Sequence, residues 1–191
     1  MERTTDAGLE HIPIWESMLG LRDLWFWWVA LRNEISARRP SQVAQGLWVG
    51  GVATPHRWRV LQGLGVSAVV MLTREFAAPR WYHSASHILW LPVRDRACPN
   101  WSQLAAGCDF VDWCQGSEVG VFVSCGSGVG RAPTLCAAWL IRRGQPRHRA
   151  LDTLRQARSV AAPTPEQRLG LQAWETAVHT ANSEALGHPQ V

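Results

Sequence analysis

The chain has 191 residues, which is the length of one domain with at most a short extension. Hydrophobic residues make up 47% of it and charged residues 18%, so the composition favours a globular domain with a sizeable core over a disordered chain. The formal net charge is +4, and all 19 basic residues are arginine, because the sequence contains no lysine. This absence excludes a Walker-type phosphate loop and lysine Schiff-base catalysis.

The cysteine pattern predicts free thiols. Five cysteines are present, an odd number, and none are spaced as C-x-x-C, so we expect neither a disulfide framework nor a zinc site. No secretory signal is recognisable, and reduced thiols fit a cytoplasmic protein. The longest apolar run, Leu24 to Leu31, is far shorter than the about 20 residues that cross a bilayer. We expect no metal and no cofactor.

Residues 14–35 predict an amphipathic helix within an N-terminal extension of residues 1–40. Apolar side chains recur there at helical spacing, at Ile14, Met18, Leu21, Trp25, Trp28 and Ile35. The run from Trp25 to Trp28 is entirely aromatic, so this helix must cover another surface. We expect it to dock against the domain core or a second subunit. The alternatives are peripheral contact with a membrane surface and a membrane-anchored scaffold built around this helix.

Residues 41–181 alternate between strand-length apolar runs and helices. We expect strands at 47–49, 67–72, 88–93 and 119–123. Helices are expected to open at Thr54-Pro55, Asn100, Arg131, Pro146 and, through a capping box, Thr164. This alternation indicates an α/β fold, a central mostly parallel sheet flanked by helices. After about residue 182 the composition turns small and polar, which predicts a flexible tail over 182–191.

The segment from Cys125 to Arg131 carries the chemistry. Cys125 follows the last predicted strand, Arg131 begins a helix, and glycines stand at 126, 128 and 130 between them. The glycines let backbone N–H groups converge on one point at a helix N-terminus, where an anion is stabilised. Cysteines in such sites have pKa values of about 3.5 to 7.5, and an arginine can grip two phosphate oxygens at once. We therefore expect a thiolate nucleophile at Cys125 and a phosphate cradle of Gly126, Ser127, Gly128, Val129, Gly130 and Arg131.

This segment resembles the C-x5-R signature of cysteine-based phosphatases. The longer stretch from Ser124 to Thr134 is similar to the small dual-specificity type, and the resemblance extends over about residues 46–174. Rhodanese-like and arsenate-reductase-like loops share C-x5-R. Arsenate reductases place the loop near the amino terminus and rhodanese-like domains need no upstream acid, so the place of the loop two-thirds along the chain, together with Asp95, favours dual-specificity phosphatases. The resemblance implies their fold and a cysteinyl-phosphate intermediate that water hydrolyses. It also implies a general acid, and Asp95, in a loop 30 residues before Cys125, is the candidate.

Two positions depart from the family pattern. Ser124 replaces the histidine that usually precedes the nucleophile, and Ala132 replaces the serine or threonine that usually follows the arginine. The hydroxyl of Thr134 is a candidate to support the leaving thiolate in place of the missing one. Because both departures bear on turnover, a phosphate-binding pseudo-phosphatase that acts as an interaction module is an alternative to an enzyme.

The family default predicts phosphotyrosine and phosphoserine or phosphothreonine in proteins as substrates. The cradle interior, residues 126–130, has no basic residue, which favours a monophosphate ester, so a singly phosphorylated lipid or metabolite is the alternative. Six arginines between Arg142 and Arg158 fit a solvated helical face, with Asp152 and Arg155 paired, or a docking surface for acidic partners. We expect no nucleic-acid binding, because no recognised binding module accompanies this charge.

Overall fold

The computed structural model describes residues 14–35, 39–75 and 77–185. Its helices are α1 (Ile14–Ile35), α2 (Pro55–Gly63), α3 (Trp101–Gly116), α4 (Arg131–Arg142), α5 (Arg147–Ala157) and α6 (Pro165–Ala185), with a short 3-10 helix at Arg80–Ser84. Its strands are β1 (Ser41–Ala44), β2 (Leu47–Gly51), β3 (Val66–Thr73), β4 (His87–Val93) and β5 (Gly120–Cys125). Every helix and strand predicted from the sequence is present, while β1 and the 3-10 helix were not predicted.

The five strands form one sheet in the order β1-β2-β5-β3-β4. β2, β3, β4 and β5 pair in parallel, and only β1 runs antiparallel, at the edge beside β2. The predicted mostly parallel sheet flanked by helices is confirmed. Strand β5 lies between β2 and β3, so the residue at its carboxyl end lies in the middle of the sheet edge where α/β folds place their ligands.

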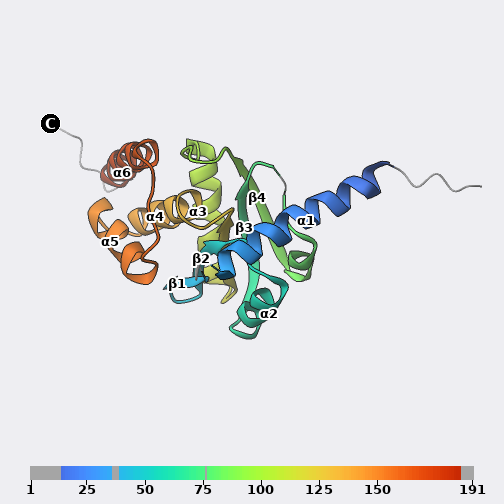
Figure 1. The fold of residues 1–191 in the computed structure, drawn as a ribbon. Coiled ribbons are helices and arrows are strands. Elements are labelled where there is room, and N and C mark those ends of the chain that lie inside the picture. The colour runs from blue at the N-terminus through green and yellow to red at the C-terminus, as the bar shows by residue number, and fades with distance from the viewer. Residues whose placement is uncertain (1–13, 36–38, 76, 186–191) are drawn as a thin grey trace, which may run out of the picture.

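Helices cover both faces of the sheet, as Figure 1 shows. Alternate residues of β5 point to opposite faces, because side chains of a strand alternate: Val121 and Val123 join the core under α3, α4, α5 and α6, whereas Phe122 joins the core under α1 and α2. Both cores contain fully buried aliphatic or aromatic side chains. The sheet is therefore buried on both faces, which explains why its strands read as continuous apolar runs.

Helix α1 docks on the domain, but through a different face from the predicted one. Figure 1 shows its C-terminal half against the sheet and its N-terminal end reaching past the body. The buried side chains are Phe26, Val29, Ala30 and Asn33. From the predicted stripe, Leu21 and Trp28 are 69% and 61% exposed and Trp25 is half-buried, while the side chains of Ile14, Met18 and Ile35 lie outside the described part. Because this helix is apolar around most of its circumference, periodicity did not determine which face packs.

No helix among the described residues is long and apolar enough to span a membrane. The outward face of α1 nevertheless carries large apolar side chains, namely Leu21, Leu24, Trp27, Trp28 and Leu31. Contact of this face with a membrane surface or a subunit stays a prediction.

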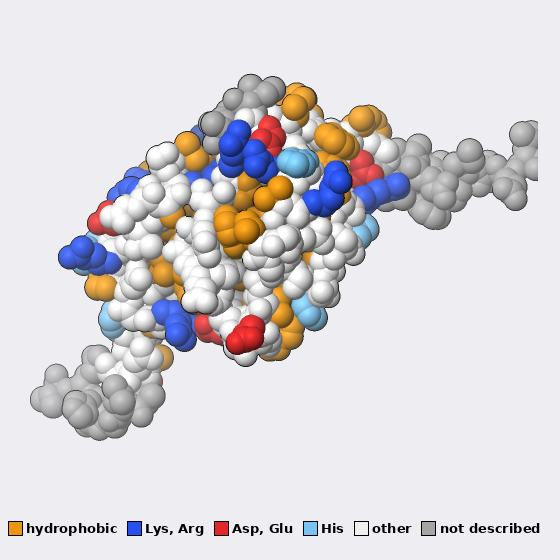
Figure 2. Space-filling view, turned by 90° about the horizontal axis from the view of Figure 1, so that it is seen from below, with side chains coloured by type: hydrophobic (Ala, Val, Ile, Leu, Met, Phe, Trp, Pro, Cys, Tyr) orange, Lys and Arg blue, Asp and Glu red, His pale blue; other side chains and the backbone are white. Residues whose placement is uncertain are grey.

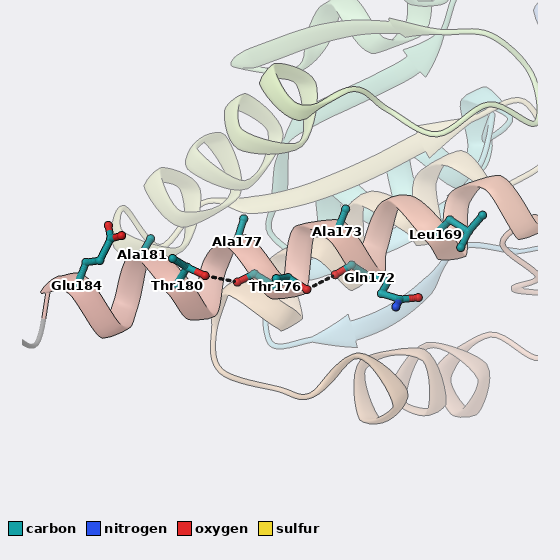
Figure 3. A pocket seen from close by; sticks show the side chains of 8 residues that line it. All are labelled: Leu169, Gln172, Ala173, Thr176, Ala177, Thr180, Ala181 and Glu184. Atoms are coloured by element: carbon teal, nitrogen blue, oxygen red, sulfur yellow. Dashed lines mark hydrogen bonds between the residues drawn. The ribbon is translucent and has the colours of Figure 1, made fainter. Parts of the chain in front are cut away.

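Helix α6 runs to Ala185, past the start of the tail expected at residue 182. Its alanines favour the helix, and the hydroxyls of Thr176, Thr180 and Ser183 donate to carbonyls one turn earlier, as Figure 3 shows for the first two. Small and polar side chains therefore do not end this helix. The remainder of the expected tail, residues 186–191, lies outside the described part.

Three of the six arginines between Arg142 and Arg158 form ion pairs within the described part of the chain. Arg142 binds Asp109 and Asp112, Arg147 binds Glu175, and Arg155 binds Asp152 across one helical turn. On the face seen in Figure 2, the arginine side chains lie in separate places, some of them beside acidic ones. The pairing predicted for Asp152 and Arg155 is confirmed. Arg143 and Arg149 are exposed, whereas Arg158 is buried.

Candidate active site

Cys125 is the last residue of β5 and is 2% exposed. It lies at the floor of a cavity of about 270 Å³. The walls of this cavity come from the loop after β5, from the first residue of α4 and from two other loops, and they comprise Asp95, Arg96, Ser127, Val129, Gly130, Arg131, Ala162 and Thr164. The predicted nucleophile, arginine and acid, which the sequence separates by up to 36 residues, therefore line one cavity.

The backbone of the loop from Gly126 to Gly130 is held in place by hydrogen bonds to its carbonyl groups. Each of these five carbonyls accepts a hydrogen bond from a residue beyond the loop: Gly126 O from Val52 N and Asn33 Nδ2, Ser127 O and Gly128 O from Arg158, Val129 O from Ala162 N, and Gly130 O from Thr134. In a planar trans peptide the N–H points opposite to the carbonyl. The N–H groups that follow these carbonyls therefore point away from those donors, the arrangement that the predicted anion nest requires.

Gly128 makes the closest approach in this loop. Its φ is +66°, and a Cβ there would lie 2.2 Å from the carbonyl carbon of Gly50. Ser127 forms a bridge with Gly51 of β2 on the same side. Only glycine fits both the left-handed backbone and the contact with β2, so this position sets how tightly the loop can curl around Cys125.

Arg131 is 5% exposed and its guanidinium lies across the cavity. Its Nη1 donates to the carbonyl of Val93 at 2.9 Å, and its Nη2 lies 3.1 Å from Oδ1 of Asp95. The same Nη1 is 4.0 Å from Glu75 Oε2. Asp95 itself is open to solvent, with 74% of its side chain exposed. The Arg131 guanidinium is thus held by the buried carbonyl of Val93. Its ion-pair partner Asp95 is exposed to solvent, so another anion can replace it.

The loop that carries Asp95 is held by the start of α6. Thr164 and Gln167 form the predicted capping box. The hydroxyl of Thr164 also donates to Arg96 O at 3.0 Å, and Gln167 Nε2 donates to Ala97 O at 2.9 Å. Arg96 has a φ of +66°, a conformation that a non-glycine residue adopts only when its surroundings hold it. The capping box therefore also positions the loop that carries the candidate acid.

No group of three or more histidine, cysteine, aspartate or glutamate side chains in the described part of the chain could hold a metal ion.

Comparison with known proteins identifies the family. The family model described as "Polymorphic toxin system, DSP-PTPase phosphatase" matches residues 45–145, which includes Cys125, Arg131 and Asp95. The chain belongs to this family. The predicted resemblance to dual-specificity phosphatases is confirmed.

Individual relatives agree with this assignment. Dual specificity protein phosphatase 5 of Rattus norvegicus is 30% identical over 138 residues, which is 71% of this chain and 35% of that protein, so the DSP-PTPase chain spans about a third of the length of such curated relatives. The structure of human DUSP28 is 26% identical and superposes with a TM-score of 0.67, covering 73% of this chain and 95% of that one. The structure of PTPMT1 in complex with PI(5)P shares the fold, with 19% identity, a TM-score of 0.69 and coverage of 75% and 98%.

The residues that depart from the family pattern are enclosed. Ser124 and Ala132 are fully buried. Ser124 lies beside Tyr82. Burial raises the pKa of the Tyr82 phenol, and the hydrogen bond that its oxygen accepts from Ala53 N at 2.8 Å offsets part of that rise. The Thr134 hydroxyl donates to Gly130 O at 2.9 Å, so its hydrogen closes the first turn of α4. Its expected support of the thiolate stays a prediction.

Three supporting residues in this DSP-PTPase domain were missed by sequence reasoning. Arg158, which the sequence placed on a solvated face, is 3% exposed and grips two loop carbonyls. Asn33, on α1, donates to Gly126 O from 93 positions away. Gln167 was assigned only a capping role. Two features of the sequence could have indicated these roles. Arg158 directly follows Ala157, where the predicted helix ends, and Asn33 is a polar residue within a helix rich in aromatic side chains.

Proposed function

We propose that the chain hydrolyses phosphate monoesters through a cysteinyl-phosphate intermediate. The observation that carries this proposal is the cradle itself: five loop carbonyls held outward around Cys125, with the buried Arg131 across the opening. Convergent amides and a guanidinium stabilise the equatorial oxygens of a phosphoryl group in transfer. A sulfur nucleophile at the base of such a cradle attacks phosphorus in line with the leaving oxygen.

In the first step, the Cys125 thiolate forms the S–P bond as the P–O bond to the leaving group breaks. Asp95 delivers a proton to the departing oxygen, so an alcohol or phenol leaves. In the second step, the Asp95 carboxylate takes a proton from water, the water oxygen attacks phosphorus, and the S–P bond breaks to return the thiolate. When phosphate occupies the cradle, it replaces Asp95 as the anion next to Arg131 Nη2, which frees the carboxyl group for these transfers.

We propose phosphotyrosine and phosphoserine or phosphothreonine in proteins as the substrates. The names of the curated relatives, dual specificity protein phosphatases, support this class. PTPMT1 was crystallised with PI(5)P, so a singly phosphorylated lipid is the alternative that the assay must include. A thiolate nucleophile has to stay reduced, and we therefore propose that the chain acts in the cytoplasm.

The test is hydrolysis of a generic aryl phosphate, with and without a chelator, by wild type, Cys125→Ser, Asp95→Asn and the control Asp152→Asn. Asp152 is an exposed aspartate paired with Arg155. We expect metal-independent turnover, no turnover for Cys125→Ser, a fall of about 10² to 10⁴ in kcat for Asp95→Asn and wild-type rates for the control. Phosphopeptides and phosphoinositide vesicles then rank the substrate classes.

Two results would overturn the proposal. Turnover that survives Cys125→Ser would remove the cysteinyl-phosphate mechanism. If wild type and Cys125→Ser are equally inactive yet both bind a phosphopeptide, the chain is a phosphate-binding module, the function that the departures at Ser124 and Ala132 favour.

A further inference from the structure

A second cavity adjoins the one that contains Cys125. Its volume is about 200 Å³, and helix α1 forms one wall of it through Trp25, Trp28, Val29 and Arg32. The opposite wall comprises Glu75, Asp95, Gly126, Ser127 and Arg131. Asp95, Ser127 and Arg131 line both cavities. The two cavities are therefore compartments of one site, and the N-terminal helix, which the sequence analysis treated as an extension, contributes to it.

The α1 wall is held in place. Val29, one residue after Trp28, is 3% exposed and packs in the core with Phe26, so this turn of the helix is fixed on the domain. The Arg32 guanidinium lies 5.3 Å from the centre of the Trp28 ring, an arrangement that orients the indole by cation–π attraction. Trp28 remains 61% exposed. The Trp28 indole is thus exposed at the mouth of the active site, and its contact with Arg32 already restricts its side-chain conformation.

The position of Asp95 indicates what occupies this cavity. In the proposed mechanism Asp95 protonates the leaving oxygen, so the group attached to that oxygen starts beside Asp95, where the two cavities meet. A tyrosyl ring, bonded directly to the ester oxygen, extends from there as a flat apolar plate that can pack against an indole. The methylene of a phosphoserine or phosphothreonine is too short to present an equivalent surface.

We propose that this α1-walled cavity is a subsite for the aromatic ring of phosphotyrosine, with Trp28 as its specificity-determining residue. The inference rests on the proposed function, because it takes the phosphoryl group to lie over Cys125. It goes beyond that function by assigning substrate preference to a helix outside the matched family segment, residues 45–145.

The chain offers a matched control for Trp28. Trp27 is the adjacent indole on the same helix, is 49% exposed, and packs against Trp81 at 5.6 Å between ring centres. It does not line the described cavity. Substituting either residue removes one partly exposed indole from α1, but only Trp28→Ala changes the wall of the proposed subsite.

The experiment compares one peptide sequence carrying either phosphotyrosine or phosphothreonine. We expect Trp28→Ala to lower the ratio of kcat/KM for phosphotyrosine over phosphothreonine about tenfold, chiefly through KM, and Trp27→Ala to leave that ratio as in wild type. An aromatic contact of about 1.4 kcal/mol corresponds to this factor. An unchanged ratio in Trp28→Ala, or the same fall in both variants, would overturn the subsite. The subsite would also be overturned if Trp28→Ala lost activity only on phosphoinositide vesicles, since Trp28 would then contact a lipid substrate and not a tyrosyl ring.

A binding measurement separates failure of this inference from failure of the proposed function. The same two peptides are titrated onto the Cys125→Ser protein with and without Trp28→Ala. A phosphotyrosine preference that disappears with Trp28→Ala supports the subsite even if wild type shows no turnover. A preference that survives Trp28→Ala refutes it even if wild type is an active phosphatase.

Discussion

Asn33 connects helix α1 to the phosphate loop, and removing its side-chain amide should loosen both. Its Nδ2 donates to Gly126 O and to Val52 O, each at 3.0 Å, and the side chain is 4% exposed. Gly126 immediately follows Cys125 and begins the cradle. The substitution Asn33→Leu removes both donors while it keeps a helix-forming side chain of similar length.

The expected cost follows from these contacts. Two buried hydrogen bonds contribute about 1 kcal/mol each, and a carbonyl left without its donor in the interior adds about 1 kcal/mol or more. We therefore expect the free energy of unfolding to fall by about 3 kcal/mol, or Tm by about 6 to 12 °C in a domain of this size. Since Gly126 loses one of its two outside donors, we also expect the Kd for inorganic phosphate or tungstate to rise at least about tenfold.

The assay pairs denaturant unfolding with calorimetric titration of tungstate, and Glu34→Ala is the control. Glu34 is the next residue of α1, and it accepts from Arg57 Nε at 2.8 Å and so ties the helix to α2 without contacting the loop. Its loss should cost about 1 kcal/mol or less and leave tungstate affinity as in wild type. If Asn33→Leu destabilises the protein but binds tungstate like wild type, Asn33 only anchors the helix, and the reasoning about the loop is wrong.

Three further predictions concern the loop and the core thiols. Gly128→Ala should abolish phosphate binding, because its Cβ would lie 2.2 Å from Gly50 C, whereas Gly63→Ala, which has open space around it, should bind phosphate normally in the same titration. Arg158→Met should lower both the free energy of unfolding and kcat, because it leaves the carbonyls of Ser127 and Gly128 without the donors that Arg158 provides. Arg155→Met, on an exposed pair, should change the free energy of unfolding by less than about 0.5 kcal/mol, and equal effects of the two substitutions would contradict the supporting role. Burial raises the pKa of Cys108 from 9.0 to about 12. Between these pH values the folded protein keeps a proton that the unfolded chain loses, so the free energy of unfolding should decrease as pH rises from 9 towards 12. Cys108→Ala should make that decrease smaller in urea unfolding measured at alkaline pH, and an unaltered slope would refute this assignment.

Local patterns in the sequence were sufficient for most of the architecture. The buried strands read as apolar runs, the helix starts carried Thr54-Pro55 or the Thr164 capping box, and both caps are present in the structure. Cys125, Arg131 and the intervening glycines could be assigned to a phosphate cradle because all the needed groups lie within seven consecutive residues. In each of these patterns, the interactions that determine the local structure are made between residues only a few positions apart in the sequence.

The structure corrected the sequence where a long-range contact decided the outcome. In α1, apolar on most sides, Phe26 and Val29 are buried rather than Leu21, because the fold places remote partners against that face, such as Trp81, whose ring centre lies 6.4 Å from that of Phe26. The sequence predicted Arg158 to be a surface arginine. It is buried because it donates to loop carbonyls that are brought together only in the folded protein.

The sequence alone determined that this chain forms an α/β domain with a mostly parallel sheet, and it predicted a thiol at the base of an anion nest, since strand periodicity, caps and glycine conformations act between near neighbours. Only the tertiary structure decided which distant side chains hold that nest, brought Asp95 to within 3.1 Å of the Arg131 guanidinium and placed Trp28 at its entrance. Those arrangements arise from hydrogen bonds and packing between remote segments, as between Asn33 and Gly126, which are 93 residues apart, and no local pattern encodes which remote partner a buried carbonyl will find.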